Sequence, residues 1–226
     1  MEYKLNDNAF DVHDSLPFLD IQLNPINHKL YARQCQLDVY CFLENGDIVL
    51  TLGGSDAIIP IFINAKLYTG RNHVVLEVVA EKRRVLLENS RIHQCGFDVI
   101  SEIPSDSTFY YNNKYDIITL NTDCENNQII PSVSFDILIK AKLLFYTAIV
   151  CEKEYLIVLY DILMKYQYVT EIVKTIMYRA YIDDNNEEQS MFVQTQINKL
   201  CSLLYEKGFR VIKSFDFSQY VVWKRM

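Results

Sequence analysis

Residues 37–52 read LDVYCFLENGDIVLTL, and this stretch carries the strongest indication of local fold in the chain. Apolar residues alternate with other residues up to Leu43, and a second apolar run begins at Ile48. The two runs are separated by Asn45-Gly46, a pair that is typical of a two-residue β-hairpin turn. The stretch therefore predicts an antiparallel hairpin that turns at Asn45-Gly46.

Apolar runs separated by turn signals continue on both sides of this hairpin. Turn signals recur roughly every 8–12 residues between residues 30 and 125, as expected for an antiparallel sandwich or barrel. The apolar runs between them, each predicted to be a strand, cover 58–67, 73–80, 97–103, 108–111 and 115–120. The charged segment 81–84 is predicted to be the tip of a further hairpin.

The period of the apolar residues changes after Pro131. Helical spacing predicts helices over 134–150, 154–166, 170–181 and 189–207. Apolar residues at 209–215 and 219–223 then predict a closing hairpin. The predicted fold class is α+β, with an N-terminal antiparallel β-rich sandwich or barrel-like unit over 1–128. The second predicted domain, 129–226, is a helical region that ends in a helix plus a β-hairpin.

Composition and charge narrow the class of protein. The 226 residues are half hydrophobic, which excludes the composition of a disordered chain, and the net charge is −7. A chain this acidic is unlike a generic binder of phosphate backbones. The first ten residues lack the pattern of a signal peptide, and the most apolar segment contains Asp136, Lys140 and Lys142. We therefore expect a cytoplasmic protein with no membrane span and with its six scattered cysteines reduced.

Three polar motifs were weighed as chemical sites. Gly53-Gly54-Ser55-Asp56 could form a nest for an anion, but a phosphate loop needs a longer glycine pattern, a lysine and a following helix. Because a strand is predicted to follow, the motif is interpreted as a turn. Asp11, His13 and Asp14 are interpreted as a surface loop. His93 and Cys95 lack the paired partners of a zinc site and any sign of an activated thiol. No catalytic, metal or cofactor-binding residue, and no cofactor, is predicted.

Four basic residues in the first half of the chain are concentrated between residues 71 and 84. These residues are Arg71, Lys82, Arg83 and Arg84. If they lie on one edge, they could contact a phosphate or an acidic partner surface. The alternative, which the hairpin prediction favours, is a solvated tip.

The end of the chain offers a candidate contact surface. Three helices followed by a hairpin match the outline of a winged helix, but the balanced charge of this region does not favour nucleic acid as a partner. Alternation can bury only about half of the large apolar groups of the hairpin. The candidate interface residues are Phe217, Tyr220, Val222 and Trp223. The alternative is that helix 189–207 covers them and that Trp223 belongs to the core.

The absence of a catalytic motif favours a protein without enzymatic activity. The predicted function is a structural or interaction subunit of a larger assembly, with other protein subunits as partners in a homo- or hetero-oligomer. The chain is rich in Tyr, Ile, Asn and Asp, as AT-rich coding sequences of large viruses and phages are, which suggests a viral structural component, within a virion. Two alternatives stay open: a nucleic-acid-binding or regulatory module on the winged-helix-like region, and an enzyme whose site is assembled from distant residues.

Overall fold

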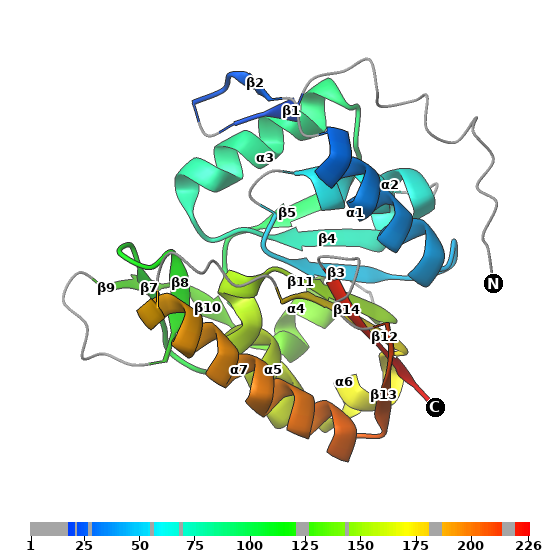
Figure 1. Ribbon diagram of the computed structural model, residues 1–226, viewed down its shortest axis with the longest axis vertical. Helices are drawn as coiled ribbons and strands as arrows, with labels where there is room; N and C mark the ends of the chain where they lie inside the picture. Colours follow the sequence, from blue (N-terminus) through cyan, green and yellow to red (C-terminus); the bar gives the residue numbers. More distant parts are fainter. Residues whose placement is uncertain are drawn as a thin grey trace.

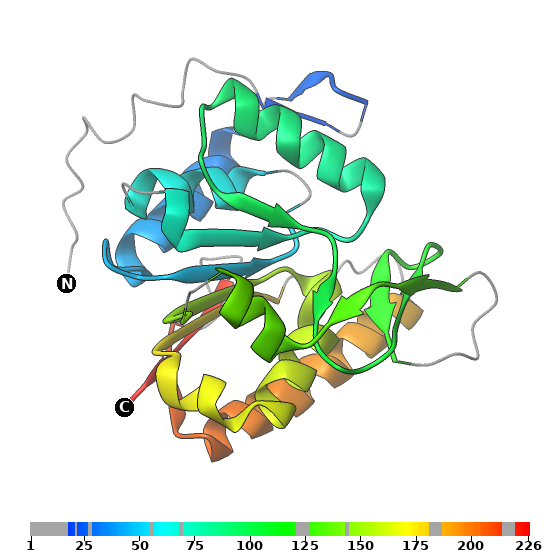
Figure 2. The same ribbon diagram turned by 180° about the vertical axis from the view of Figure 1, so that it is seen from behind.

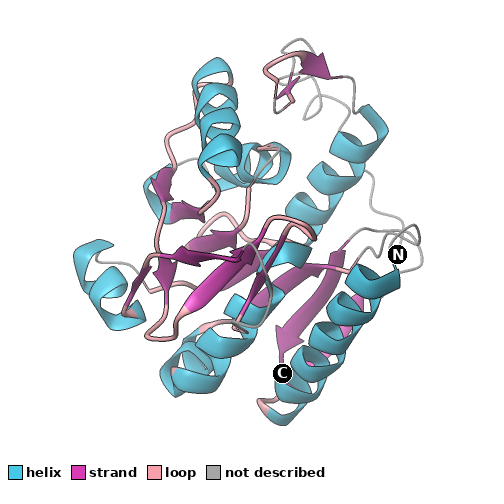
Figure 3. Cartoon of the chain, turned by 90° about the vertical axis from the view of Figure 1, so that its left-hand side faces the viewer, coloured by secondary structure: helices cyan, strands magenta, loops and turns pink. Residues whose placement is uncertain are grey.

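A seven-stranded sheet lies between two layers of helices in the computed structural model (Figure 1, Figure 3). The structure describes residues 18–20, 22–26, 29–54, 57–67, 70–120, 127–142, 145–180, 187–213 and 220–226. The strand order is β13-β14-β12-β11-β3-β4-β5. In chain order the strands are β3 (Val49–Leu52), β4 (His73–Leu76), β5 (Asp98–Ile100), β11 (Ala148–Cys151), β12 (Thr175–Arg179), β13 (Phe209–Lys213) and β14 (Tyr220–Arg225). Strand β14 runs antiparallel to the other six strands, which are all parallel to one another.

The order of the strands gives the sheet a switch point. From β3 the chain moves outward to β4 and β5, and it then returns to β11 on the other side of β3. In open sheets of this kind the connections leave a crevice beyond the carboxyl ends of the two strands where the direction reverses. Here those two strands are β3 and β11, so the crevice is expected where they end.

Helices cover both faces of the sheet. The helices are α1 (Lys29–Phe42), α2 (Ile58–Leu67), α3 (Ala80–Ile92), α4 (Phe135–Lys142), α5 (Leu156–Lys165), α6 (Gln167–Ile172) and α7 (Glu187–Glu206), with 3-10 turns η2 (Gly70–Asn72) and η3 (Lys153–Tyr155). Alternate strand residues enter two separate cores: Leu50 packs with α4 to α7, whereas Val49 packs with α1 and α2. Burial on both faces explains why these strands are almost continuously apolar.

Short strands are inserted between β5 and α4. These are β6 (Ile103–Pro104), β7 (Phe109–Asn112), β8 (Ile117–Thr119), β9 (Asn127–Ile130) and β10 (Ser132–Val133). Strands β8, β7 and β9 form a small antiparallel sheet, and β8 packs against η3 and α5. Seen from behind, the chain leaves β5 and passes directly into this inserted unit (Figure 2). At the start of the chain, β1 (Phe18–Leu19) and β2 (Pro25–Ile26) form a ribbon against α3.

The predicted N-terminal antiparallel sandwich or barrel is wrong, beginning with the hairpin at Asn45-Gly46. Residues 29–42 form α1 instead. The buried positions Cys35, Val39 and Leu43 are four residues apart and lie on one helical face. The alternation that suggested a strand was therefore a by-product of a helix that also carries apolar residues away from the core.

One further strand and one further hairpin tip predicted in this half are also wrong. Residues 58–67 form α2, which is buried nearly all round, so its sequence shows no period. Pro60 lies in the first turn, where its missing N–H has no partner to lose. The expected hairpin tip 81–84 lies within α3. The strand expected from residue 73 is present as β4.

The second half was predicted more accurately. The helices expected over 154–166 and 189–207 are confirmed as α5 and α7, and the closing hairpin is confirmed as β13 and β14. Segments 134–150 and 170–181 each divide into a helix and a parallel strand. A winged helix is therefore not formed. The boundary predicted at residue 128 falls inside β9, and the large sheet takes strands from both sides of it.

Two simpler expectations concern cysteines and membranes. Within the described ranges none of the five cysteines forms a disulfide, and Cys124 lies outside those ranges. Among the helices that the structure describes, none combines the length and the apolar content needed to cross a membrane.

Candidate functional site

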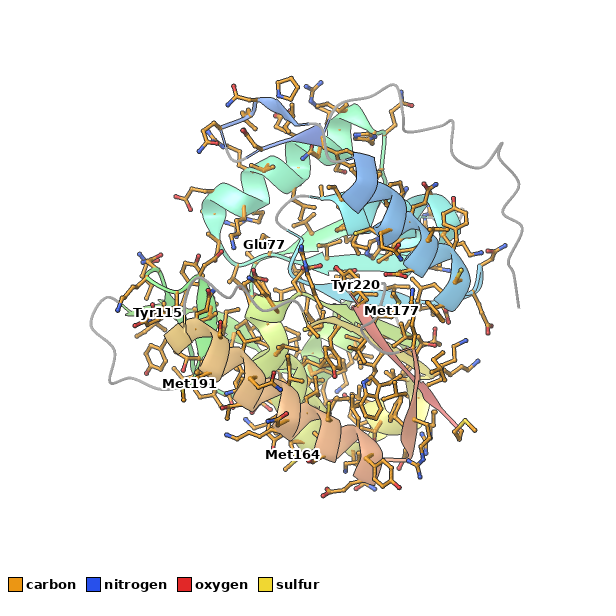
Figure 4. All side chains as sticks on the ribbon, viewed as in Figure 1. Glu77, Tyr115, Met164, Met177, Met191 and Tyr220 are labelled. Atoms are coloured by element: carbon orange, nitrogen blue, oxygen red, sulfur yellow. The ribbon has the colours of Figure 1, made fainter. Side chains whose placement is uncertain are left out.

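The carboxyl ends of β3, β4 and β11 meet at the switch point of the sheet. Gly53-Gly54 follows β3, Glu77 follows β4, and residues 152–155 follow β11. Figure 4 shows Glu77 at the end of β4, on the side of the molecule where the inserted strands lie. This is the edge at which ligands bind in open α/β sheets.

The turn after β3 requires glycine at both positions. Gly53 has φ of +85°, which favours glycine, and its N–H donates to the carbonyl of Leu76 over 2.9 Å. A Cβ on Gly54 would lie 2.8 Å from Cγ1 of Val75. The turn is thus packed closely against β4, and α2 begins a few residues later at Ile58.

Glu77 is fully buried, and its carboxylate accepts hydrogen bonds from two backbone N–H groups and one hydroxyl. Its Oε2 accepts from the backbone N–H of Gly54 over 3.2 Å. Its Oε1 accepts from the N–H of Val79 over 3.0 Å and from the hydroxyl of Tyr155 over 2.8 Å. Burial raises the pKa of Glu77, and Lys82 together with these donors offsets only part of the rise. The carboxyl therefore joins the ends of β3, β4 and β11.

Tyr155 fills the space in front of the glycine turn. Its side chain is 3 % exposed. A Cβ added to Gly53 would lie 2.8 Å from Cδ2 of the Tyr155 ring and 2.9 Å from Cβ of Glu152. The hydroxyl of Tyr155 also accepts from the N–H of Val78 over 3.1 Å. The ring therefore packs directly on the backbone of Gly53.

Charged groups surround this centre. Nζ of Lys82 lies 2.5 and 2.7 Å from the two carboxylate oxygens of Asp116, and the hydroxyl of Tyr111 donates to Asp116 over 2.5 Å. Burial lowers the pKa of Lys82, but Glu154 and Asp116 more than offset this and raise it. Burial raises the pKa of Glu154 to about 7, with Lys82 opposing and Glu152 adding to the rise. A carboxyl that titrates near neutral pH at a strand end is a candidate functional group.

Glu152 is fixed from the opposite side. Its carboxylate accepts from Nη1 of Arg179 over 3.2 Å and from the hydroxyl of Tyr220. Arg179 belongs to β12 and Tyr220 to β14, so Glu152 ties the end of β11 to the next two strands. Its role in the described structure is to hold the loop that carries Glu154 and Tyr155.

A cavity of about 360 Å³ opens beside the turn that follows Glu77. Its lining combines the start of α3 with the inserted strands: Val78, Val79, Ala80, Glu81, Tyr111, Asn113 and residues 128–131. This volume lies within the range of small-molecule sites. The inserted unit thus supplies one wall of the candidate site.

The predicted basic concentration is divided by the fold. Arg71 is exposed at the amino end of β4. Lys82, Arg83 and Arg84 lie on α3, beyond the carboxyl end of β4. Nη1 of Arg83 donates to the carbonyls of Glu77 and Val78 over 2.9 and 3.2 Å. Lys82 and Arg83 therefore support the candidate site, and a contact of the four residues with an anionic partner stays a prediction.

The candidate interface residues of the C-terminal hairpin are buried where they are described. Tyr220, Val222 and Trp223 belong to β14, which lies between β12 and β13. Phe217 lies outside the described residues. These three side chains pack into the cores on both faces of the sheet. A partner contact through this end of the chain stays a prediction.

The remaining motifs supply no chemistry that the structure brings together. The His93 ring stacks on Phe18 at 4.6 Å, and burial raises the pKa of Cys95 to about 11, which disfavours a thiolate. The cluster Asp11, His13 and Asp14, and the pair Ser55-Asp56, lie outside the described residues. Among the described side chains, no group of three His, Cys, Asp or Glu residues could hold a metal ion.

Sequence reasoning missed Glu77, and the reason is specific. A strand, a glycine turn, a helix and then an acidic residue about 20 residues further on is the pattern of a nucleotide-binding α/β unit. The sequence has Gly53-Gly54 and Glu77 at that spacing. The glycine motif was weighed only as a phosphate loop and was rejected for its short glycine pattern, its missing lysine and the strand expected at 58–67. Only the last of these grounds was wrong, because residues 58–67 form α2.

Comparison with known proteins shows which fold this is. No protein-family model and no curated protein sequence matches the chain. Among solved structures, a proposed rRNA methylase from Clostridium thermocellum aligns with a TM-score of 0.53 and 12% identity over 90% of this chain and 98% of that one. Precorrin-6y C5,15-methyltransferase from Geobacter metallireducens gives 0.50 and 10% over 97% and 95%. Ribosomal protein L11 methylase from Lactobacillus delbrueckii gives 0.50 and 8% over 89% and 81%.

The chain therefore has the Rossmann-like fold of these methyltransferases, with a mostly parallel central sheet. All three solved structures are enzymes by name. This finding contradicts the predicted non-enzymatic structural subunit of a virus or phage. The second of the two alternatives left open by the sequence was an enzyme whose site is assembled from distant residues. The candidate site draws on residues from 53 to 155.

Proposed function

We propose that the chain is an S-adenosylmethionine-dependent methyltransferase. The observation that carries the proposal is the meeting of Gly53-Gly54 and Glu77 at the switch point, with a hydrogen bond of 3.2 Å from Gly54 to the carboxylate. In α/β sheets of this topology an acidic residue at the end of the second strand binds the ribose hydroxyls of a nucleotide ligand. The names of the three similar structures support a methyl donor as that ligand.

The charge around the glycine turn favours a cationic ligand. The carboxyl groups at this edge are those of Glu77, Asp116, Glu152 and Glu154, and they outnumber the cations Lys82, Arg83 and Arg179. A dinucleotide would place its anionic pyrophosphate here. Carboxylates in a partly buried site repel a pyrophosphate and attract the sulfonium and ammonium groups of S-adenosylmethionine. When bound, this cofactor supplies a methyl group to a nucleophile of the substrate.

The residues fit part of the cofactor. The cavity beside Val78 and Val79 can hold a base, with Glu77 at the ribose. The part beyond the ribose would lie over Gly53, where the Tyr155 ring now packs. The base therefore has a place, whereas the ribose and the amino-acid end have none while Tyr155 stays there.

The similarity to solved structures does not identify the class of substrate. Their names point to an RNA, a ribosomal protein and a small corrinoid precursor. The net charge of −7 and the carboxylates around the site disfavour docking of a phosphate backbone. We therefore favour a protein or a small molecule as substrate over a nucleic acid.

The test compares the binding of three ligands and the effect of removing the carboxyl group of Glu77. S-Adenosylhomocysteine, NAD⁺ and ATP are titrated at millimolar concentration against the full chain, with thermal unfolding and calorimetry as readouts. We expect S-adenosylhomocysteine alone to stabilise, by about 1.4 kcal/mol at ten times its Kd. Glu77→Ala should abolish this gain.

The matched control is Glu171→Ala, which removes an exposed carboxyl on α6. Each variant is judged by its shift on adding ligand, because Glu77→Ala also leaves buried amides without an acceptor. Preferential stabilisation by NAD⁺ or ATP would contradict the proposal. So would a folded Glu77→Ala variant that binds S-adenosylhomocysteine as well as the natural chain does.

A further inference from the structure

We propose that Tyr155 is a gate that closes the cofactor site and sets how much of the cofactor the chain can bind. This inference rests on the proposed function, because it assigns the ligand's place from Glu77 and the glycine turn. Tyr155 lies at the end of η3, between β11 and α5, and its side chain reaches the ends of β3 and β4.

The hydroxyl of Tyr155 occupies the position of a ribose hydroxyl. It donates to Oε1 of Glu77 over 2.8 Å, and Oε2 of Glu77 accepts from Gly54. Glu77 is 0 % exposed, so no part of its carboxylate faces a ligand in this arrangement. A ribose can donate to Oε1 only after the hydroxyl of Tyr155 leaves, and the carboxylate then keeps a donor on each oxygen.

The ring of Tyr155 occupies the next part of the ligand's place. Glycine at this turn allows a ligand to approach the backbone closely. Here ring atoms of Tyr155 approach Gly53. A Cβ added to Gly53 would lie 2.8 and 2.9 Å from two of them. The space that glycine leaves beside the backbone is therefore filled by the ring of Tyr155. Ring and hydroxyl thus exclude two adjacent parts of one cofactor.

The surroundings of Tyr155 allow it to be tested separately from the fold. Its backbone belongs to a single 3-10 turn outside the sheet, held by the bond from its N–H to the carbonyl of Glu152 over 3.0 Å. If only a fraction of molecules is open, the apparent affinity for a ligand falls by that fraction. The natural chain should therefore bind weakly, and variants at Tyr155 should bind more tightly.

Two variants separate the hydroxyl from the ring. Tyr155→Phe releases Oε1 of Glu77 but keeps the ring on Gly53. Tyr155→Ala removes both. Adenosine needs only the place of the hydroxyl, whereas S-adenosylhomocysteine needs both places. The two ligands should therefore respond differently to the two variants.

The experiment is calorimetric titration of both ligands into the natural chain and each variant, with circular dichroism to confirm folding. We expect Tyr155→Phe to bind adenosine more tightly than the natural chain but to gain little for S-adenosylhomocysteine. Tyr155→Ala should gain about tenfold or more for S-adenosylhomocysteine. Adding Glu77→Ala to Tyr155→Ala should remove that gain. If Tyr155→Ala does not fold, Tyr155→Leu takes its place, since it keeps an apolar side chain without the ring.

The matched control is Tyr160→Ala, which removes a partly buried tyrosine of α5 from the same core. It should not change ligand affinity, and an equal gain there would show loosening of the core rather than opening of a gate. If the natural chain binds S-adenosylhomocysteine as tightly as Tyr155→Ala does, the gate is refuted and the cofactor site stands. If the folded Tyr155 variants bind neither ligand, the proposed function fails and the gate fails with it.

Discussion

Two glycines of this molecule differ in the space that they leave for a side chain. A Cβ at Gly54 would meet Cγ1 of Val75 at 2.8 Å, whereas a Cβ at Gly46 would meet nothing within 4 Å. Val75 is buried in β4 and has a stiff, branched side chain, so it cannot retreat. Gly54→Ala should therefore lower the free energy of unfolding by about 1–3 kcal/mol, as overpacking does.

Gly46→Ala is the control for this prediction, and denaturant titration is the measurement. Gly46 follows α1 in a turn without the left-handed φ that the hairpin prediction assumed. Its substitution should change stability by less than about 0.5 kcal/mol. Equal losses at the two positions would show that the turn after β3 is less tightly packed than the structure indicates.

Glu154 should make stability depend on pH near neutrality. Burial raises the pKa of this carboxyl to about 7 in the folded chain, with Lys82 lowering it and Glu152 and Asp116 raising it. A raised pKa means that the folded state binds the proton more tightly than the unfolded state does. Its contribution is thus complete below the unfolded value of 4.5 and is lost as pH rises through about 7.

We expect the free energy of unfolding to fall by on the order of 1–2 kcal/mol between pH 5 and pH 8, a range discounted for partial solvent contact. Glu154→Gln should flatten this profile, measured by denaturant titration at each pH. Glu77 also has a raised pKa, so a smaller slope of the same sign should remain. Glu171→Gln, on the surface of α6, should leave the slope unchanged. An unchanged slope in Glu154→Gln would contradict the shift.

At the scale of single elements, the sequence predicted the amphipathic pieces and failed on the buried ones. Helix α7 was predicted because the spacing of its apolar residues leaves one face polar. In the structure Gly208, with φ of +86°, follows its last turn. Helix α2 was not predicted, because Ile58 to Leu67 is buried on almost every side and a fully apolar run has no period. Its proline in the first turn was the available sign of a helix start.

That one element also concealed the link between the glycine turn and its acid. The turn Gly53-Gly54 and the acid Glu77 acquire meaning only when α2 connects β3 to β4 in a parallel pair. Tyr155 could not be placed from the sequence at all. It reaches Glu77 only because β11 returns beside β3, a contact between residues far apart in the chain.

At the scale of the whole molecule, the last strand reports on the sheet as a unit. Trp223 is the only tryptophan, is 5 % exposed, and pairs with Ile176 of β12 and Val211 of β13. Strands β3 to β5 come from the first half of the chain and join these strands through β11. Neither half completes its sheet or its two cores alone. Loss of one half should therefore remove the support of the other.

We accordingly expect a single cooperative transition, in which the fluorescence of Trp223 and the far-ultraviolet circular dichroism of the whole chain change together. The measurement is denaturant titration followed by both signals on the same samples. Trp223→Phe serves as the control, because its circular dichroism must still show one transition without the probe. A dichroism curve with two steps, of which fluorescence follows only one, would show that residues 1–128 and 129–226 unfold separately. Such a result would favour two domains over one sheet, because a shared sheet of seven strands cannot lose four of them and leave the other three packed on both faces.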